Sequence, residues 1–166
     1  EMRGVVGLVN IGHEMTNINI LEDGIPVLTR DLPVGTRRFR EDIQRERGLS
    51  ADEADQLLQG FERNEILDPF LETRGEELPV GIERAAAFLQ SASRSAGGIS
   101  RLWLTGGGGR IPGLNKVLAD RLRLPVELAN PLARLRVAEG VCSTVGVDEI
   151  SPLLMLPIGL ALRTAA

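Results

Sequence analysis

Two glycine-containing segments carry the residue types that could bind a phosphate-bearing ligand. The first runs Asn-Ile-Gly-His-Glu-Met-Thr from Asn10 to Thr16, between two apolar stretches. A tight turn there would gather backbone N–H groups, Gly12 would let them approach a ligand, and Thr16 would add a hydroxyl. A plain hairpin turn is the alternative explanation of the same residues.

The second segment reads LTGGGGRIPGL over residues 104–114. Consecutive glycines, among them Gly106, Gly107 and Gly108, cost chain entropy, which favours either left-handed backbone geometry or the approach of a flat ligand. A helix starting near Pro112 would bring its positive end close. The spacing fits neither the Walker A loop nor the dinucleotide fingerprint. A flexible solvent-exposed loop is the alternative.

The remaining residue types exclude several classes of site. The chain has one cysteine, Cys142, and one histidine, His13, which excludes an internal disulfide, a cysteine-rich zinc site and a histidine-cluster metal site. No serine stands in a G-x-S-x-G elbow. We therefore assign no catalytic residue and no metal ligand. Trp103 is expected in the core, and Glu76 and Glu77 are expected to be solvated.

Three successive strands would hold the first segment. Gly4–Asn10 is nearly all apolar, and Met15–Leu21 alternates between apolar and polar residues. A third apolar stretch, Ile25–Leu32, follows an Asp-Gly turn signal. These patterns predict an antiparallel three-strand meander.

Helical patterns follow the meander. Gly48 would stop a helix that starts after Gly35, and Ser50 would begin the next one with capping-box spacing to Glu53. Residues 62–78 include a proline and a glycine and are expected to be broken or loop-like, and another helix follows up to about residue 96.

A second sheet region would position the glycine-rich segment. The glycine-rich segment would follow a strand at Ile99–Leu104, and a second, short strand would lie at Pro125–Leu128. A last helix would run from Ser151 to Arg163, kinked or delayed by Pro157. The predicted fold class is α/β, with a mixed sheet that begins with the meander and is flanked by helices.

The composition is that of a globular domain with little affinity for nucleic acid. Of 166 residues, 43% are hydrophobic and 25% are charged, the formal net charge is −4, and aromatic residues make up 3% with no tyrosine, which disfavours a basic or base-stacking surface. The longest apolar stretch, Leu153–Leu162, is about half a membrane span. Residues 1–12 lack the pattern of a signal peptide. We expect a cytoplasmic chain without direct membrane insertion.

Five segments resemble the PilM family of type IV pilus assembly proteins, which are FtsA-like members of the actin-like ATPase superfamily. The two glycine segments are similar to the second phosphate loop and the adenosine loop of that superfamily. The similar segments are LVNIGHEMTNINILEDGIPVLTRDLPVG (8–35), FREDIQRERGLSADEAD (39–55), WLTGGGGRIPGL (103–114), VELANPLARL (126–135) and LPIGLALR (156–163).

The resemblance implies an actin-like (ribonuclease H-like) C-terminal lobe over residues 1–166, with a mainly helical subdomain at about 36–98 and no N-terminal lobe. It implies ATP with Mg²⁺ in the full-length protein, bound by the cofactor-binding residues Asn10, Gly12, Thr16, Gly106, Gly107 and Gly108. In the actin-like ATPase superfamily the phosphate loop usually begins with Asp, whereas Asn10 lacks the charge that helps organise Mg²⁺ and water.

The same resemblance implies partners and a location. The partners would be a PilN-like inner-membrane protein, bound mainly through the lobe missing here, and other pilus platform proteins, so the chain would lie at the inner membrane through them. Two alternatives stay open: a non-catalytic scaffold of a type II secretion platform (GspL-like) and a metabolic kinase of the same superfamily. We expect no hydrolysis and little or no ATP binding by this chain alone.

Overall fold

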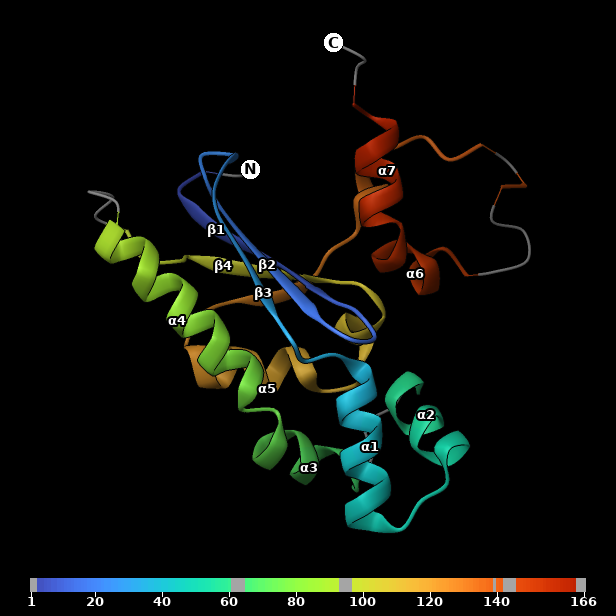
Figure 1. Ribbon diagram of the computed structural model, residues 1–166. Helices are drawn as coiled ribbons and strands as arrows, with labels where there is room; N and C mark the ends of the chain where they lie inside the picture. Colours follow the sequence, from blue (N-terminus) through green and yellow to red (C-terminus); the bar gives the residue numbers. More distant parts are fainter. Residues whose placement is uncertain (1–2, 61–64, 93–96, 139, 142–145, 164–166) are drawn as a thin grey trace.

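The chain folds around one five-stranded sheet of strand order β3-β2-β1-β4-β5. The computed structural model describes residues 3–60, 65–92, 97–138, 140–141 and 146–163. Helices α1 to α3 lie together at one end of the sheet, α4 and α5 pack beside one another along it, and α6 and α7 lie apart from them (Figure 1). The α/β fold class predicted from the sequence is confirmed.

The predicted meander is present. Strands β1 (Val5–Ile11), β2 (Thr16–Glu22) and β3 (Ile25–Leu32) pair antiparallel in chain order. β1 is buried along most of its length, as its apolar sequence predicts. β3 is largely exposed and has a strand neighbour on one side only among the described strands. The meander therefore ends in an open sheet edge.

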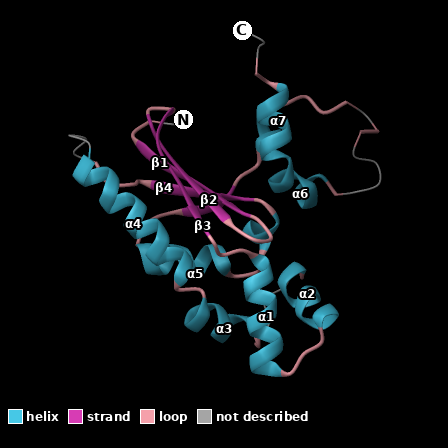
Figure 2. Ribbon diagram, in the orientation of Figure 1, coloured by secondary structure: helices cyan, strands magenta, loops and turns pink. Residues whose placement is uncertain are grey.

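Two parallel strands extend the sheet on the other side of β1. β4 (Arg101–Thr105) pairs parallel with β1, and β5 (Val126–Leu128) pairs parallel with β4 (Figure 2). Parallel pairing needs a long crossover, and helices provide it. The crossover from β3 to β4 carries α1 to α4, and the one from β4 to β5 carries η1 (Gly107–Arg110) and α5 (Leu114–Leu122).

Four helices fill the described part of the crossover from β3 to β4. They are α1 (Thr36–Arg47), α2 (Ala51–Gln59), α3 (Leu67–Arg74) and α4 (Glu77–Ala92). The predicted stop at Gly48 is confirmed, because this residue adopts φ +67° and its N–H donates to the carbonyl of Gln44. The helices share one core, in which the Phe39 and Phe70 rings meet edge to face at 6.3 Å.

Two sequence predictions about helix positions need correction. Residues 62–78 were expected to be broken or loop-like, yet α3 occupies Leu67–Arg74 and α4 begins at Glu77. Pro69 sits in the first turn of α3, where its missing N–H has no helical partner to lose. The helix expected near Pro112 begins two residues later, at Leu114, after Gly113 at φ +83°.

The C-terminal segment is a chain of short helical pieces. The predicted single helix is divided into η3 (Ser151–Leu154) and α7 (Met155–Ala161), preceded by η2 (Pro131–Arg134) and α6 (Val147–Ile150). Pro157 lies in the first turn of α7, so the helix is delayed rather than kinked. Within the described ranges no helix has the length and apolarity needed to cross a bilayer.

The capping box of α2 makes its stability pH-dependent. The Ser50 backbone N–H donates to Glu53 Oε2 at 2.8 Å, the Ser50 hydroxyl donates at 2.7 Å, and the Glu53 N–H returns a bond to Ser50 Oγ. These donors, the backbone N–H foremost, lower the pKa of Glu53. Because the Glu53 pKa is lower in the folded than in the unfolded state, the carboxylate stabilises the fold at pH values above its unfolded-state pKa. This stabilisation is lost as the pH falls through the folded-state pKa.

We therefore expect Glu53→Gln to lower the free energy of unfolding at pH 7 and to have a smaller effect below about pH 4, where the wild-type carboxylate is protonated. Urea unfolding at several pH values measures this difference. Glu72→Gln, at an exposed position of α3, is the control. A Glu53→Gln effect that is constant with pH would contradict the prediction.

Candidate functional site

The parallel pairing of β1 and β4 brings the two glycine segments together. Asn10 is the register partner of Thr105, so both strands end at the same edge of the sheet, and each is followed by one segment. This is the edge at which open α/β sheets bind ligands. Residues that are about ninety positions apart in the sequence (Asn10 and Thr105) thus become neighbours.

The first segment is bonded to the start of α1. The Gly12 N–H donates to the Met15 carbonyl at 3.0 Å, which closes the turn. The N–H groups of Thr36 and Arg37 donate to the carbonyls of Gly12 and His13, both at 2.9 Å. The turn is therefore rigidly placed, and the Gly12 N–H is already used within it.

Thr16 and Asn10 support the turn from within the sheet. Thr16 is fully buried, and its hydroxyl donates to the Val34 carbonyl at 2.7 Å. Asn10 Nδ2 donates to Asn17 Oδ1 at 3.2 Å across the β1–β2 pair. Both side chains hold neighbouring segments of the protein in this structure.

The three predicted glycines of the second segment have different surroundings. Gly106 has φ +79°, and a Cβ there would lie 2.6 Å from Asn10 Oδ1. A Cβ on Gly108 would clash with the side chains of Ile11 and Thr36. A Cβ on Gly107 would meet only Leu153 Cδ2, at 3.9 Å. Gly106 and Gly108 thus allow close packing, whereas Gly107 has open space in front of it.

The glycine-rich segment is ordered by the C-terminal part of the chain. The Thr105 hydroxyl and the Gly106 N–H both donate to the Pro152 carbonyl, at 2.6 and 3.0 Å. Residues 107–110 then form the 3₁₀ turn η1, in which Gly108 and Gly109 are buried. The flexible solvent-exposed loop considered as an alternative is not what the structure contains.

A cavity of about 480 Å³ lies between the two segments and helices α1 and α2. Of the six residues predicted to bind a cofactor, Gly12 and Gly107 line this cavity, and the other four are not among its lining residues. His13 and Leu153 also line it. The remaining lining residues, which sequence reasoning missed, are Thr36, Arg40, Asp55, Leu58, Gln59, Arg110 and Ile111.

An arginine–aspartate pair connects the two helices beside the cavity. Arg40 Nη1 of α1 lies 3.4 Å from Asp55 Oδ2 of α2, and the buried Arg40 Nε has no hydrogen-bond partner among the described residues. Unpaired buried donors are uncommon and costly. Arg40 and Asp55 belong to different helices, so no periodic pattern in the sequence indicated the pair.

The donor set fits a phosphate-bearing ligand better than a free metal ion. The cavity is lined by Arg40, Arg110, Thr36 and His13, which can donate hydrogen bonds to an anion. Asp55 is the single carboxylate among its lining residues. In the described ranges no three His, Cys, Asp or Glu side chains form a group that could hold a metal. Cys142 lies outside the described residues.

The difference between the glycines yields a test of folding. Gly108→Ala should lower the free energy of unfolding by about 1–3 kcal/mol, because its Cβ must displace Ile11 or Thr36. Gly107→Ala is the matched variant one residue away and should change stability by less than about 0.5 kcal/mol. Thermal or urea unfolding of both proteins compares them, and equal losses would contradict the assignment.

Solved structures share this fold over nearly the whole chain. A structure described as the PilM-PilN type IV pilus biogenesis complex matches with TM-score 0.80 and 27% identity, covering 98% of this chain and 46% of that chain. The ethanolamine utilization protein EutJ from Carboxydothermus hydrogenoformans matches with TM-score 0.67 and 18% identity, covering 99% and 50%. MreB5 of Spiroplasma citri bound to AMPPNP matches with TM-score 0.53 and 15% identity, covering 97% and 55%.

These matches establish an actin-like fold, and the chain spans about half the length of the structures it matches. The sequence profile of the family described as type IV pilus assembly protein PilM matches residues 1–165. This match assigns the chain to one family, rather than to the GspL-like secretion-platform proteins or the metabolic kinases that the sequence left open as alternatives. The chain belongs to the PilM family of type IV pilus assembly proteins.

Proposed function

We propose that this chain is the C-terminal half of a pilus assembly protein that binds ATP with Mg²⁺ when full length. The observation that carries the proposal is the 480 Å³ cavity where both glycine segments meet α1 and α2. Its volume falls within the range of small-ligand sites. A fold shared with MreB5, which is bound to AMPPNP in its solved structure, supports the same ligand class.

In this proposal the residues at the cavity have different roles in binding. Gly12 and Gly107 let the backbone approach the ligand, while Arg40, Arg110 and Thr36 supply hydrogen-bond donors for phosphate oxygens. Asn10, Thr16, Gly106 and Gly108 hold the two segments in register.

Bound ATP would supply a Mg²⁺–phosphate group whose charge these residues recognise. Asn10 provides no carboxylate at the position where the superfamily has Asp, so binding without efficient hydrolysis is the expected output.

The C-terminal helices would contact the other half of the protein. Leu153, Leu156 and Leu160 are 46%, 69% and 55% exposed, on η3 and α7 beside the cavity. Large exposed apolar patches mark interfaces. We expect the remaining half of the protein to cover these leucines and to close the cavity from that side.

The family assignment also supports a location and partners. A PilN-like inner-membrane protein and other platform proteins would bind the assembled molecule, which would act on the cytoplasmic side of the inner membrane. A nucleotide-free scaffold is the second candidate, and the observation that favours it is Asn10.

Calorimetric titration of the full-length protein with ATP and Mg²⁺ distinguishes the two candidates. Gly107→Leu should weaken ATP binding at least about tenfold, because its side chain would enter the cavity. Gly97→Leu is the control, since its Cβ also has open space but lies away from the cavity.

No measurable ATP binding by the wild-type protein would favour the scaffold. Unchanged binding by a folded Gly107→Leu variant would show that ATP occupies another site. This 166-residue chain alone should bind ATP weakly or not at all and should not hydrolyse it. A robust ATPase activity of the chain alone would contradict that expectation.

A further inference from the structure

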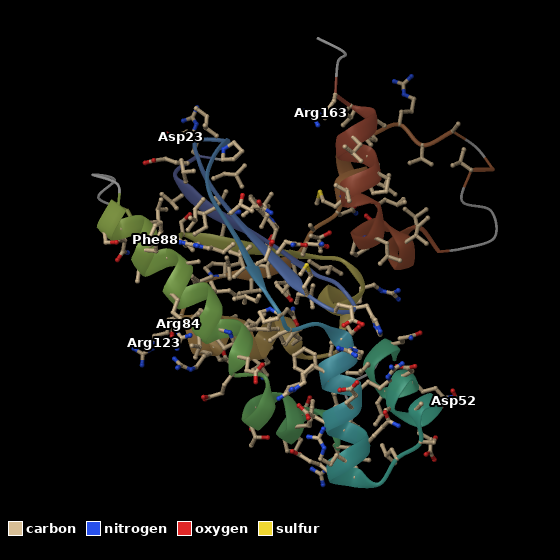
Figure 3. All side chains as sticks on the ribbon, viewed as in Figure 1. Asp23, Asp52, Arg84, Phe88, Arg123 and Arg163 are labelled. Atoms are coloured by element: carbon tan, nitrogen blue, oxygen red, sulfur yellow. The ribbon has the colours of Figure 1, made fainter. Side chains whose placement is uncertain are left out.

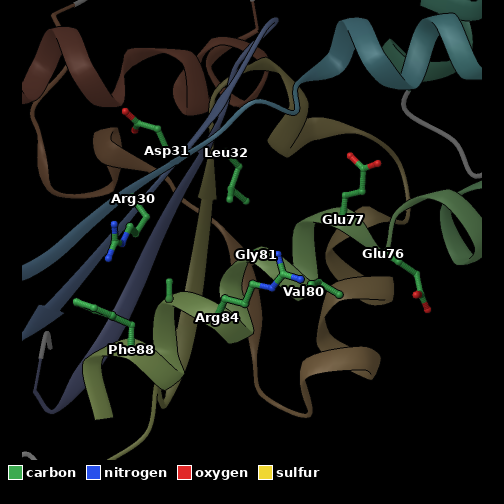
Figure 4. Close-up of a pocket in the computed structure, with 10 residues that line it drawn as sticks. Arg30, Asp31, Leu32, Glu76, Glu77, Val80, Gly81, Arg84 and Phe88 are labelled. Atoms are coloured by element: carbon green, nitrogen blue, oxygen red, sulfur yellow. The ribbon is translucent and has the colours of Figure 1, made fainter. Parts of the chain in front are cut away.

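A second cavity, of about 530 Å³, lies away from both glycine segments, between strand β3 and helix α4. Its lining residues come from the end of β3 and from residues 76–88, and Figure 4 shows them on the two facing elements. It shares no lining residue with the first cavity. The nucleotide proposal therefore does not account for it.

The strand beside this cavity is an open sheet edge. β3 pairs only with β2 among the described strands, and residues along it are exposed in the pattern expected of an unpaired edge. Alternate residues of an edge strand direct their backbone N–H and carbonyl groups outward, where another strand can pair with them. Pro26 has no backbone N–H to donate to an added strand at the beginning of β3, whereas residues 27–32 include no proline.

Close packing of β3 on α4 fixes the floor of the groove. Gly81 lies inside α4, where glycine costs about 1 kcal/mol relative to alanine. A Cβ on Gly81 would clash with the Leu32 side chain. This glycine therefore lets β3 approach the helix, and the groove exists before any partner arrives.

The two ends of the groove carry opposite charge. At one end the Arg30 guanidinium lies 4.5 Å from the centre of the exposed Phe88 ring of α4. From the preceding turn of α4, Arg84 extends its guanidinium toward the middle of the groove, beside Gly81 and Val80 (Figures 3 and 4). At the other end are Glu76 and Glu77, of which Glu77 Oε1 lies 3.9 Å from Arg38 Nη2. Asp31 also lines the cavity, and its carboxylate accepts a hydrogen bond from Asn17 Nδ2 at 2.7 Å. Arg84 makes no ion pair within the described part of the chain, so its guanidinium can donate hydrogen bonds to a carboxylate of a partner.

We propose that the β3 edge binds an extended segment of a partner protein, which adds as an antiparallel strand and carries a basic residue, a small apolar residue and an acidic residue on one face. The basic residue would face Glu76 and Glu77, and the acidic residue would face Arg30 and Arg84. The apolar residue would lie over Val80 and Gly81. Main-chain bonds give such strand additions their affinity, and the side-chain pockets give specificity.

The spacing of the charges follows from helix and strand geometry. Glu76, whose carbonyl accepts a hydrogen bond from the Val80 N–H, and Arg84 are eight residues apart, which corresponds to about 12 Å along the axis of α4. Residues on one face of a strand recur about every 7 Å. Because Leu32 contacts Gly81 and Arg30 contacts Phe88, β3 runs opposite to α4. An antiparallel partner therefore places its basic residue first and its acidic residue four positions later.

The test uses a synthetic probe, acetyl-Thr-Lys-Thr-Val-Thr-Asp-Thr-amide, labelled for fluorescence anisotropy with this chain. We expect saturable binding with Kd between about 10 and 300 µM, and no binding of the same peptide with a fully N-methylated backbone. Arg84→Glu should weaken binding at least about tenfold, and replacing the probe Asp with Lys should restore binding to that variant. Arg101→Glu, at an exposed position on β4, is the matched control.

Several results would overturn the proposal. They are no binding of the probe at about 1 mM, equal binding of the N-methylated peptide, or an Arg84→Glu effect no larger than that of Arg101→Glu. Sedimentation that shows a dimer of this chain dissociated by Arg84→Glu would also overturn it, because a second copy would then occupy the edge. None of these results depends on ATP, so the nucleotide proposal is tested separately.

Discussion

The parallel pairing of β1 with β4 is the constraint on which the candidate site depends. Most residues of each strand are buried, so the shared register is set by the core and cannot slip without exposing apolar residues. That register places Asn10 beside Thr105 and sends both following segments to one edge of the sheet. Two further contacts, from Thr36 to Gly12 and from Thr105 to Pro152, then fix the segments in place.

The glycines of the site illustrate two uses of a missing side chain. Gly106 and Gly108 are needed because protein atoms occupy the space where a Cβ would be, and this requirement exists without any ligand. Gly107 borders free volume, so its missing side chain leaves room in the cavity. A run of glycines in a sequence combines both uses, and only the packing around each residue separates them.

Local patterns predicted most of the fold, and long-range contacts account for what they missed. The meander, the Gly48 stop and the Ser50–Glu53 capping box follow from residues that are close in the sequence. The sequence also predicted Gly12 and Gly107 as site residues, and both line the cavity. The Arg40–Asp55 pair could not be predicted, because it depends on how α1 packs against α2. Helix α3 was missed because proline in a first turn does not break a helix.

The parallel strands and the antiparallel strands of the sheet have different roles. The parallel strands β1 and β4 end at a point where backbone, helix termini and a cavity converge, which suits a small polar ligand. The antiparallel side ends in β3, where outward-facing main-chain groups lie beside a groove with charges of opposite sign. β2 and β1 join the two sides through hydrogen-bonded pairs, with one register shift between Ile20 and Leu21 in the β2–β3 pair, so a strand added at β3 would extend the same sheet that carries the cavity. A partner at the edge and a ligand at the cavity would then bind the same sheet, and coupling between them would require that both shift the balance between two arrangements of that sheet.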